Sequence, residues 1–198
     1  MPRIEILTEE PSMQAVLENI LPKILSNDWV LGGNYFIRAH EGKTDLQKSI
    51  PQKIKVFSNY HEPAGVIVIH DQDANDCKEL KIKLSELCKI NGNCAVLIRI
   101  ACRELEAWYL GDMLAIQKAY PNFKAEKYLR KAKFRNPDNL NAADELKKIL
   151  PEFQKIASAR AISQHLQLDS DNNKSESFKQ FLLGIDKFFG QFSSNSIN

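Results

Sequence analysis

Two aspartates one residue apart, Asp71 and Asp73, follow an apolar run in the segment AGVIVIHDQDANDCKEL, which spans residues 64–80. A pair of carboxylates at such a place can hold a divalent cation or cap the helix that follows. In an extended chain residues i and i+2 point to the same side, so the spacing predicts that both carboxylates are aimed together just beyond a buried strand. These two residues are the first candidates for chemistry.

More acids follow two other strand-like segments. Glu9 and Glu10 come directly after the first such segment, and Glu104 and Glu106 follow the fourth. Because the carboxyl ends of parallel strands lie at one edge of the sheet, we expect these acids to meet the aspartates there. Each like-charge contact at about 4 to 5 Å costs about 3 to 4 kcal/mol at an effective dielectric constant of about 20. Such a cluster needs a proton or a cation, and oxygen-only ligands suit Mg²⁺ or Mn²⁺.

Simpler interpretations of the same residues stay open. Asp73 could be the N-cap of the next helix. Glu104 and Glu106 could be solvated, and because residues two apart in a helix do not share a face, only one of them can point to the site. The single histidines His40, His61 and His70 are more typical of structural roles than of ligands. The segment EGKT at residues 41–44 lacks the earlier glycine of a P-loop, because position 37 is isoleucine.

The elements that would position these acids alternate along the chain. Strand-like apolar segments lie at residues 3–7, 34–40, 65–70 and 94–100, and helical periodicity marks residues 13–25, 74–90 and 103–120. Pro22 should end or kink the first helix, and a short helical or irregular piece follows EGKT. The pattern predicts an α/β fold with a mostly parallel sheet of about four strands covered by helices. We expect a core at 1–120, a helical extension packed on it at 121–192, and a flexible tail at 193–198.

Composition restricts the class of protein. With 43% hydrophobic and 26% charged residues, the chain has the balance of a globular protein, and a net charge of +2 indicates no partner by itself. The four cysteines lack the CxxC spacing of a zinc site and are expected to be reduced thiols. The start MPRIEILTEE does not resemble a signal peptide, and no apolar run is long enough for a membrane helix. The expected compartment is the cytoplasm, with no membrane partner.

A basic stretch, KAYPNFKAEKYLRKAKFR at residues 118–135, is the candidate nucleic-acid surface. It carries seven lysines and arginines against one acid, with aromatic residues interleaved. Cations that neutralise phosphates and rings that stack on bases are what a nucleic-acid track needs, with Lys127, Arg130 and Lys131 as the central cations. The alternative is a solvated face whose aromatic residues pack inward.

Several motifs resemble known families. ILTEEPSMQAVL followed by VIVIHDQDANDC resembles the Toprim arrangement of topoisomerases, primases and small nucleases. More narrowly, DQDANDC, RIACRELEAWYLGD, NPDNLNAADELKKIL and NKSESFKQFL resemble, over most of the chain, a bacterial Toprim-like family catalogued as domain of unknown function 4276. The resemblance implies that Glu9 is the Toprim glutamate and that Asp71 and Asp73 are its DxD motif. Toprim usually has glycine where Glu10 stands and often an acid where Met13 stands, so Glu10 could compete with Glu9 for the metal.

The expected function is that of a Mg²⁺- or Mn²⁺-dependent phosphodiesterase, a nuclease acting on nucleic acid. Glu9, Asp71 and Asp73 would hold the metal, and Glu106 or Glu104 would supply a further ligand or a general base. Lys43 and Arg103 are the cations expected near the phosphate. Related Toprim nucleases commonly work with an ATPase. Because this chain has no Walker motif, the resemblance implies a separate ATPase subunit, in phage defence or a repair-like system; a homo-oligomer is also open.

Two other functions remain open. The first is a non-catalytic regulatory or interaction subunit of an ATPase complex. The second is a receiver-like phosphoacceptor with Asp71 as the phosphorylated residue. The second is disfavoured, because ACRELE offers no hydroxyl after the fourth strand and no clear fifth strand follows.

Overall fold

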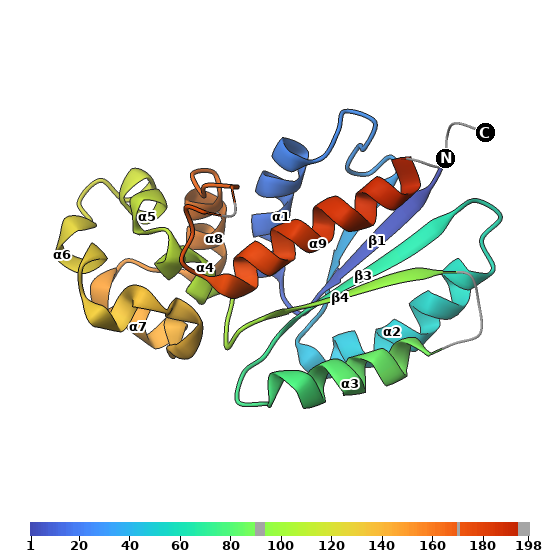
Figure 1. The fold of residues 1–198 in the computed structure, drawn as a ribbon, viewed down its shortest axis with the longest axis horizontal. Helices are drawn as coiled ribbons and strands as arrows, with labels where there is room; N and C mark the ends of the chain where they lie inside the picture. The colour runs from blue at the N-terminus through green and yellow to red at the C-terminus, as the bar shows by residue number, and fades with distance from the viewer. Residues whose placement is uncertain (90–93, 170, 194–198) are drawn as a thin grey trace.

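The computed structural model describes residues 1–89, 94–169 and 171–193. Its centre is a sheet of four parallel strands in the order β2-β1-β3-β4, as expected from the sequence (Figure 1). The strands are β1 (Arg3–Thr8), β2 (Tyr35–Ala39), β3 (Ala64–Asp71) and β4 (Ala95–Ala101). Because all four are parallel, their carboxyl ends lie at one edge of the sheet.

The apolar residues of the two inner strands, β1 and β3, alternate between the faces of the sheet and belong to two hydrophobic cores, one on each face. Ile6 and Ile67 face α1 (Pro11–Ile24) and α9 (Glu176–Ser193). Leu7 and Val66 face the opposite way, toward α2 (Lys43–Ser58) and α3 (Cys77–Cys88). Burial on both faces explains why β3 is almost continuously apolar.

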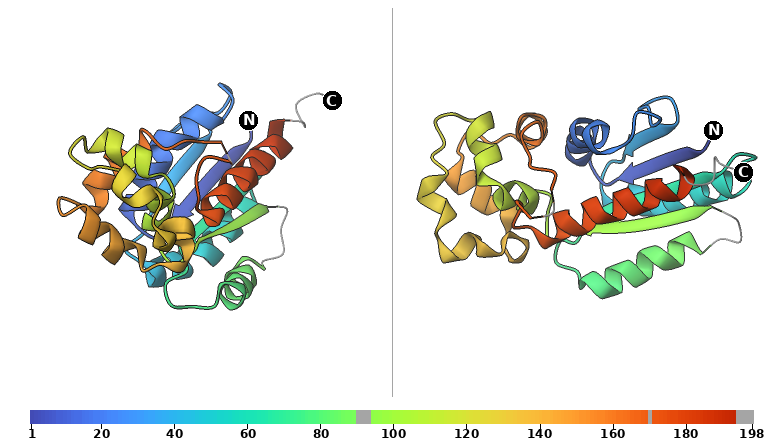
Figure 2. Two further views of the ribbon diagram at one scale, coloured as in Figure 1. Left: turned by 60° about the vertical axis from the view of Figure 1, so that its left-hand side comes forward. Right: turned by 45° about the horizontal axis from the view of Figure 1, so that its top comes forward.

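A helical lobe, residues 106–163, lies beyond the carboxyl edge of the sheet (Figures 1 and 2). Its helices are short: α4 (Glu106–Gly111), α5 (Met113–Ala119), α6 (Glu126–Leu129), α7 (Ala142–Ile149) and α8 (Lys155–Ser163), with 3₁₀ turns η1 (Ala132–Arg135) and η2 (Pro137–Asn139). The acids that follow the strands therefore lie between the sheet and this lobe.

The last helix returns from the lobe to the sheet. Ser175 caps α9 by accepting a hydrogen bond from the backbone N–H of Phe178, and the apolar stripe that includes Phe181 and Ile185 is buried in the core. Ser175 also donates to the buried carboxylate of Asp138 in η2, at 2.6 Å. The cap of α9 therefore ties the lobe to the core.

Three helical predictions needed correction. The first helix runs through Pro22 to Ile24, because a proline in the last turn removes only one backbone donor. The piece after EGKT is a full 16-residue helix, α2, which contains Pro51. The helix expected from 103 to 120 is split at Asp112, whose carboxylate caps α5. No helix among the described residues combines the length and apolar character needed to cross a membrane, and residues 194–198 of the expected tail lie outside the described part.

Candidate active site

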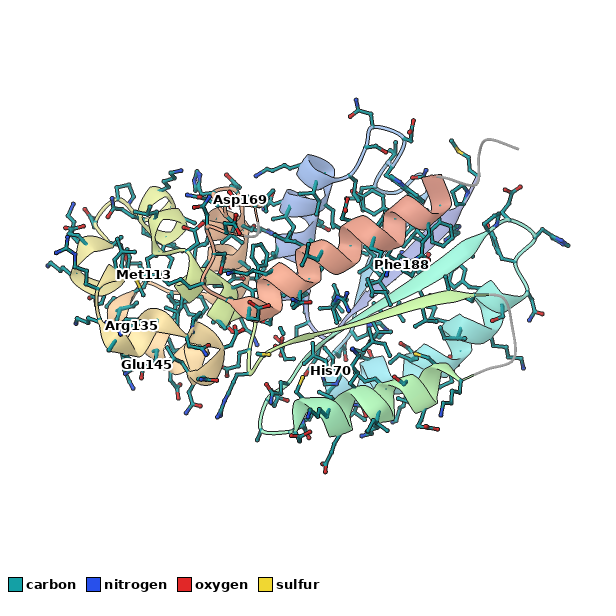
Figure 3. All side chains as sticks on the ribbon, in the orientation of Figure 1. His70, Met113, Arg135, Glu145, Asp169 and Phe188 are labelled. Carbon is teal, nitrogen blue, oxygen red and sulfur yellow. The ribbon has the colours of Figure 1, made fainter. Side chains whose placement is uncertain are left out.

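The ends of β1 and β3 bring Glu9 and Asp71 together. Glu9 is only 8% exposed, and its Oε2 accepts a hydrogen bond from the backbone N–H of Asp71 at 3.2 Å. The same oxygen lies 3.1 Å from Nδ1 of His70, which is fully buried at the end of β3 (Figure 3). Nδ1 of His70 is also 2.5 Å from the carbonyl oxygen of Asp71. Since both of its neighbours accept, Nδ1 carries the proton and holds the Glu9 carboxylate in place.

A buried group of oxygens surrounds the side chain of Asp71. Burial holds the pKa of Asp71 well above its ordinary value, and the charges of Glu106 and Glu9 raise it further. Glu106, at the start of α4, is 2% exposed, and burial raises its pKa too. Burial likewise raises the pKa of Glu9, against the lowering effect of His70. Three carboxyl groups at this edge therefore favour a bound proton or a cation.

Two buried oxygens of this group lack hydrogen-bond partners among the described residues. They are Oδ1 of Asp71 and the hydroxyl of Tyr109, which lies one turn after Glu106 on α4. Burial and the charges of Glu106 and Asp71 raise the pKa of Tyr109. A buried acceptor without a donor is costly unless a cation or a water molecule satisfies it.

Lys155 is the cation that the structure places beside these acids. It is the first residue of α8 and forms an ion pair with Glu10. Burial lowers the pKa of Lys155, but its hydrogen bond to Glu10 and the charges of Glu10, Glu106 and Asp71 outweigh burial and raise it. No pattern in the sequence indicates Lys155, because only tertiary folding brings α8 to the end of β1.

Asp73 departs from the predicted geometry. The prediction that its carboxylate points with that of Asp71 is wrong, because the strand ends at Asp71 and Asp73 has a φ of 53°, outside the extended region. Its side chain is 38% exposed, and a carboxylate oxygen lies 3.2 Å from Nζ of Lys43. Arg103 also has a positive φ, 59°, and its carbonyl accepts a hydrogen bond from Asp73 at 2.8 Å. Strained non-glycine residues of this kind cluster at functional loops.

The remaining acids have structural roles. Asp76, not Asp73, caps α3, accepting from the backbone N–H groups of Lys78 and Glu79. Glu104 accepts from the backbone N–H of Ala143 at 2.8 Å and so caps α7. Only Glu106 of the two predicted glutamates therefore reaches the carboxylate group.

The predicted cations are divided between two regions. Lys43 and Arg103 lie beside Asp73, and Arg103 lines a cavity of about 230 Å³ together with Asp73 and Asn141. Lys127, Arg130 and Lys131 are exposed around α6, at the end of the helical lobe away from the strands (Figures 1 and 2).

Aromatic residues of the basic stretch pack inward. Phe123 and Phe134 are buried, and the ring of Tyr128 stacks on that of Phe123 with centroids 5.3 Å apart. Lys131 covers the ring of Tyr128, 4.9 Å from its centroid. These rings already have partners within the lobe, so what remains available to nucleic acid on this stretch is its charge.

The acids suit a hard cation only in part. Within the described residues, no group of three or more acidic, histidine or cysteine side chains is already arranged to hold a metal ion. Glu9 and Asp71 nevertheless offer neighbouring oxygens, and Oδ1 of Asp71 is buried without a donor. Their chemistry fits Mg²⁺ or Mn²⁺, which take oxygen ligands and complete their shells with water.

A comparison with protein-family models identifies the family of this chain. The family model described as Domain of unknown function (DUF4276) matches residues 8–186, which include every acid discussed above. No curated protein matches the chain, and no solved structure does.

Proposed function

Since the chain belongs to the family described as domain of unknown function 4276, whose matched region contains the whole acidic edge, we propose that it is a Mg²⁺-dependent phosphodiesterase acting on nucleic acid. The observation that carries the proposal is Oδ1 of Asp71, which is buried without a donor from the part of the chain that the structure describes, and whose carboxyl group feels the charges of Glu9 and Glu106. A cluster of carboxylates at the carboxyl edge of a parallel sheet, with one buried oxygen that receives no hydrogen bond from the described residues, is suited to a divalent cation.

Each residue has a proposed role. Glu9 and Asp71 would hold the metal, and Asp73, which pairs with Lys43 in this structure, would be the third ligand. When bound, Mg²⁺ supplies Lewis-acid activation of the phosphate and of water. Glu106 accepts and returns a proton, since burial brings its pKa closer to neutral pH. His70 orients Glu9 from behind, as outer-shell partners of metal ligands do.

Partners follow from the resemblance to Toprim nucleases. We infer that a separate ATPase subunit works with this chain in the cytoplasm, in phage defence or a repair-like system. The absence of a Walker motif from the sequence supports a separate subunit rather than an ATPase site in this chain.

Divalent cations test the proposed site directly. At a tenfold excess over Kd, Mg²⁺ or Mn²⁺ should stabilise the folded protein by about 1.4 kcal/mol. Thermal melting in a chelator and then with added metal measures this gain. Asp71→Ala should lose it, whereas Asp76→Asn, in the same loop but outside the carboxylate group, should keep it. Wild-type melting that ignores millimolar concentrations of both ions would count against a metal site.

A non-catalytic subunit of an ATPase complex is the second candidate function. The ion pair between Lys155 and Glu10 favours it, because a lysine already supplies positive charge where a metal would otherwise be required. In that case the acids and Lys155 form a permanent structural network at the edge of the sheet.

Lys155→Met separates the two functions. In a chelator, the variant should unfold more easily by about 1 kcal/mol, because the acids lose a cation. If the protein is an enzyme, divalent metal should restore the loss and bind more tightly than to the wild type, because no lysine competes. If Lys155 is structural, no metal will restore it. Lys147→Met on the exposed side of α7 is the matched control and should change neither property.

A further inference from the structure

A polar cavity of about 440 Å³ is lined by residues of the first turns of α2 and α3. These turns lie next to the carboxyl edge of the sheet (Figure 1). Its buried wall is Leu80, and its polar residues include Lys43, Thr44, Gln47 and Lys83. The volume falls within the range of roughly 300 to 1,000 Å³ that is typical of ligand pockets.

Two side-chain contacts join this cavity to the proposed active site. Lys43 lines the cavity and reaches the carboxylate of Asp73 at 3.2 Å. Gln47 also lines it, and its amide nitrogen lies 3.0 Å from Nε2 of His70. Because Nδ1 of His70 carries the proton, Nε2 accepts from Gln47 while Nδ1 holds Glu9. A ligand group in the cavity would therefore be connected to Asp73 through Lys43, and to Glu9 through Gln47 and His70.

The charges of the cavity favour an anion. Lys43 and Lys83 face a single lining acid, Glu79. Lys83 has no ion pair within the residues that the structure describes. The start of α2 adds to this, because Gly42 precedes it with no side-chain cap, and helix N-termini carry partial positive charge.

We propose that this cavity binds a phosphate-bearing nucleotide, namely the one that neighbours the scissile phosphate on the substrate strand. The inference rests on the proposed function and adds the path of the substrate to it. From the cavity the strand passes Asp73 and continues to the second cavity, where Arg103 and Asn141 lie. The path runs along the edge of the sheet and does not need the basic stretch around α6.

Three substitutions test the cavity without touching the carboxylate group. Lys83→Gln removes a cation from the cavity and Glu79→Gln removes its acid. Lys55→Gln makes the same charge change as Lys83→Gln at the far end of α2. The measurement is binding of a short fluorescent 5′-phosphorylated single-stranded DNA, and of its RNA counterpart, in a chelator and over a range of salt concentrations. Adenosine monophosphate is the competing probe.

We expect Glu79→Gln to bind the oligonucleotide about two- to fivefold more tightly than the wild type, and Lys83→Gln to bind it about two- to fivefold more weakly. Lys55→Gln should bind it as tightly as the wild type. The slope of log K against log salt should flatten by about 0.7 in Lys83→Gln. Equal affinity and slope in all four proteins overturns the proposal. Adenosine monophosphate that binds as tightly as the oligonucleotide, with the same order, overturns the place on the substrate strand and assigns the cavity to a free nucleotide.

Cleavage assays keep this inference separate from the proposed function. A protein that shows the predicted order of binding but cleaves no nucleic acid, even with its ATPase partner, refutes the nuclease and leaves the nucleotide site standing. A protein that cleaves with the same KM in the Lys83→Gln, Glu79→Gln and Lys55→Gln variants refutes the site alone.

Discussion

Glu9→Gln is expected to lower nuclease turnover by roughly 10²- to 10³-fold while the protein stays folded, because removing one charge that stabilises a transition state costs about this much. Glutamine keeps the shape of the side chain and an oxygen that can accept from the backbone of Asp71. It loses the negative charge that a metal requires. Asp73→Asn should have a similar effect on turnover, through the loss of the proposed third metal ligand beside Lys43. Cleavage of DNA and RNA, with and without an ATPase subunit of the proposed kind, is the measurement.

Asp76→Asn is the control for both substitutions. It lies in the same loop as Asp73 and removes the same charge, but asparagine caps a helix about as well as aspartate, so both activity and the start of α3 should survive. Near-ultraviolet circular dichroism and thermal melting report on the fold. If Glu9→Gln loses structure and activity together, Glu9 is a structural residue that holds β1 against β3.

The sheet was predictable from sequence because its signals are local. The apolar run of residues 65–70 lies within β3, and burial on both faces leaves no other arrangement for so apolar a segment. Parallel strands then place their carboxyl ends together, so the meeting of Glu9 with the chain at Asp71 follows from topology alone. The last helix was predictable for the same reason, since Ser175 and the aromatic stripe of α9 form a local pattern.

The details of the site were not predictable, because they depend on the sign of the backbone φ angle at single residues and on contacts between residues far apart in the sequence. Aspartate adopts both extended and left-handed conformations, so the spacing of Asp71 and Asp73 could not show that Asp73 turns away. Lys155 meets Glu10 only when α8 packs on α1, which no periodicity reveals. His70 was predicted to be structural, and the structure adds that it supports Glu9. The likeness to Toprim remains a prediction.

At this acidic edge one buried carboxylate oxygen has no hydrogen-bond donor among the described residues, and that arrangement costs stability. His70 and the backbone of Asp71 fix Glu9, but no donor reaches Oδ1 of Asp71 among the described residues. Structural carboxylates, such as Asp138 beneath the cap of α9, are instead surrounded by donors. The contrast between Asp138 and Asp71 is what a binding residue is expected to show, since groups kept free for a ligand lack partners without it.

Asp71→Asn is therefore expected to stabilise the metal-free protein, by up to about 3 kcal/mol at neutral pH, because it replaces a carboxylate whose buried Oδ1 has no hydrogen-bond partner among the described residues. Urea unfolding in a chelator is the measurement. Asp73→Asn is the control, because that carboxylate is partly exposed and paired with Lys43, and its loss should change stability by less than about 1 kcal/mol.

The pH dependence of the stability of the fold follows from the direction in which the pKa of Asp71 is shifted. The folded-state pKa of Asp71 is raised by burial above its ordinary value of 3.8, so protonation of Asp71 stabilises the fold. That stabilisation is fully present below pH 3.8 and is lost as the pH rises through the folded-state pKa. Glu9 and Glu106 titrate in both proteins but interact with Asp71, so the difference between the two curves reports the Asp71 charge together with its effect on these glutamates. The advantage of Asp71→Asn should shrink as the pH falls. Saturating Mg²⁺ should reverse the order, because only the wild type binds it. If Asp71→Asn is instead the less stable protein in a chelator at every pH, then Asp71 has a partner within the protein and the site is not held open for a cation.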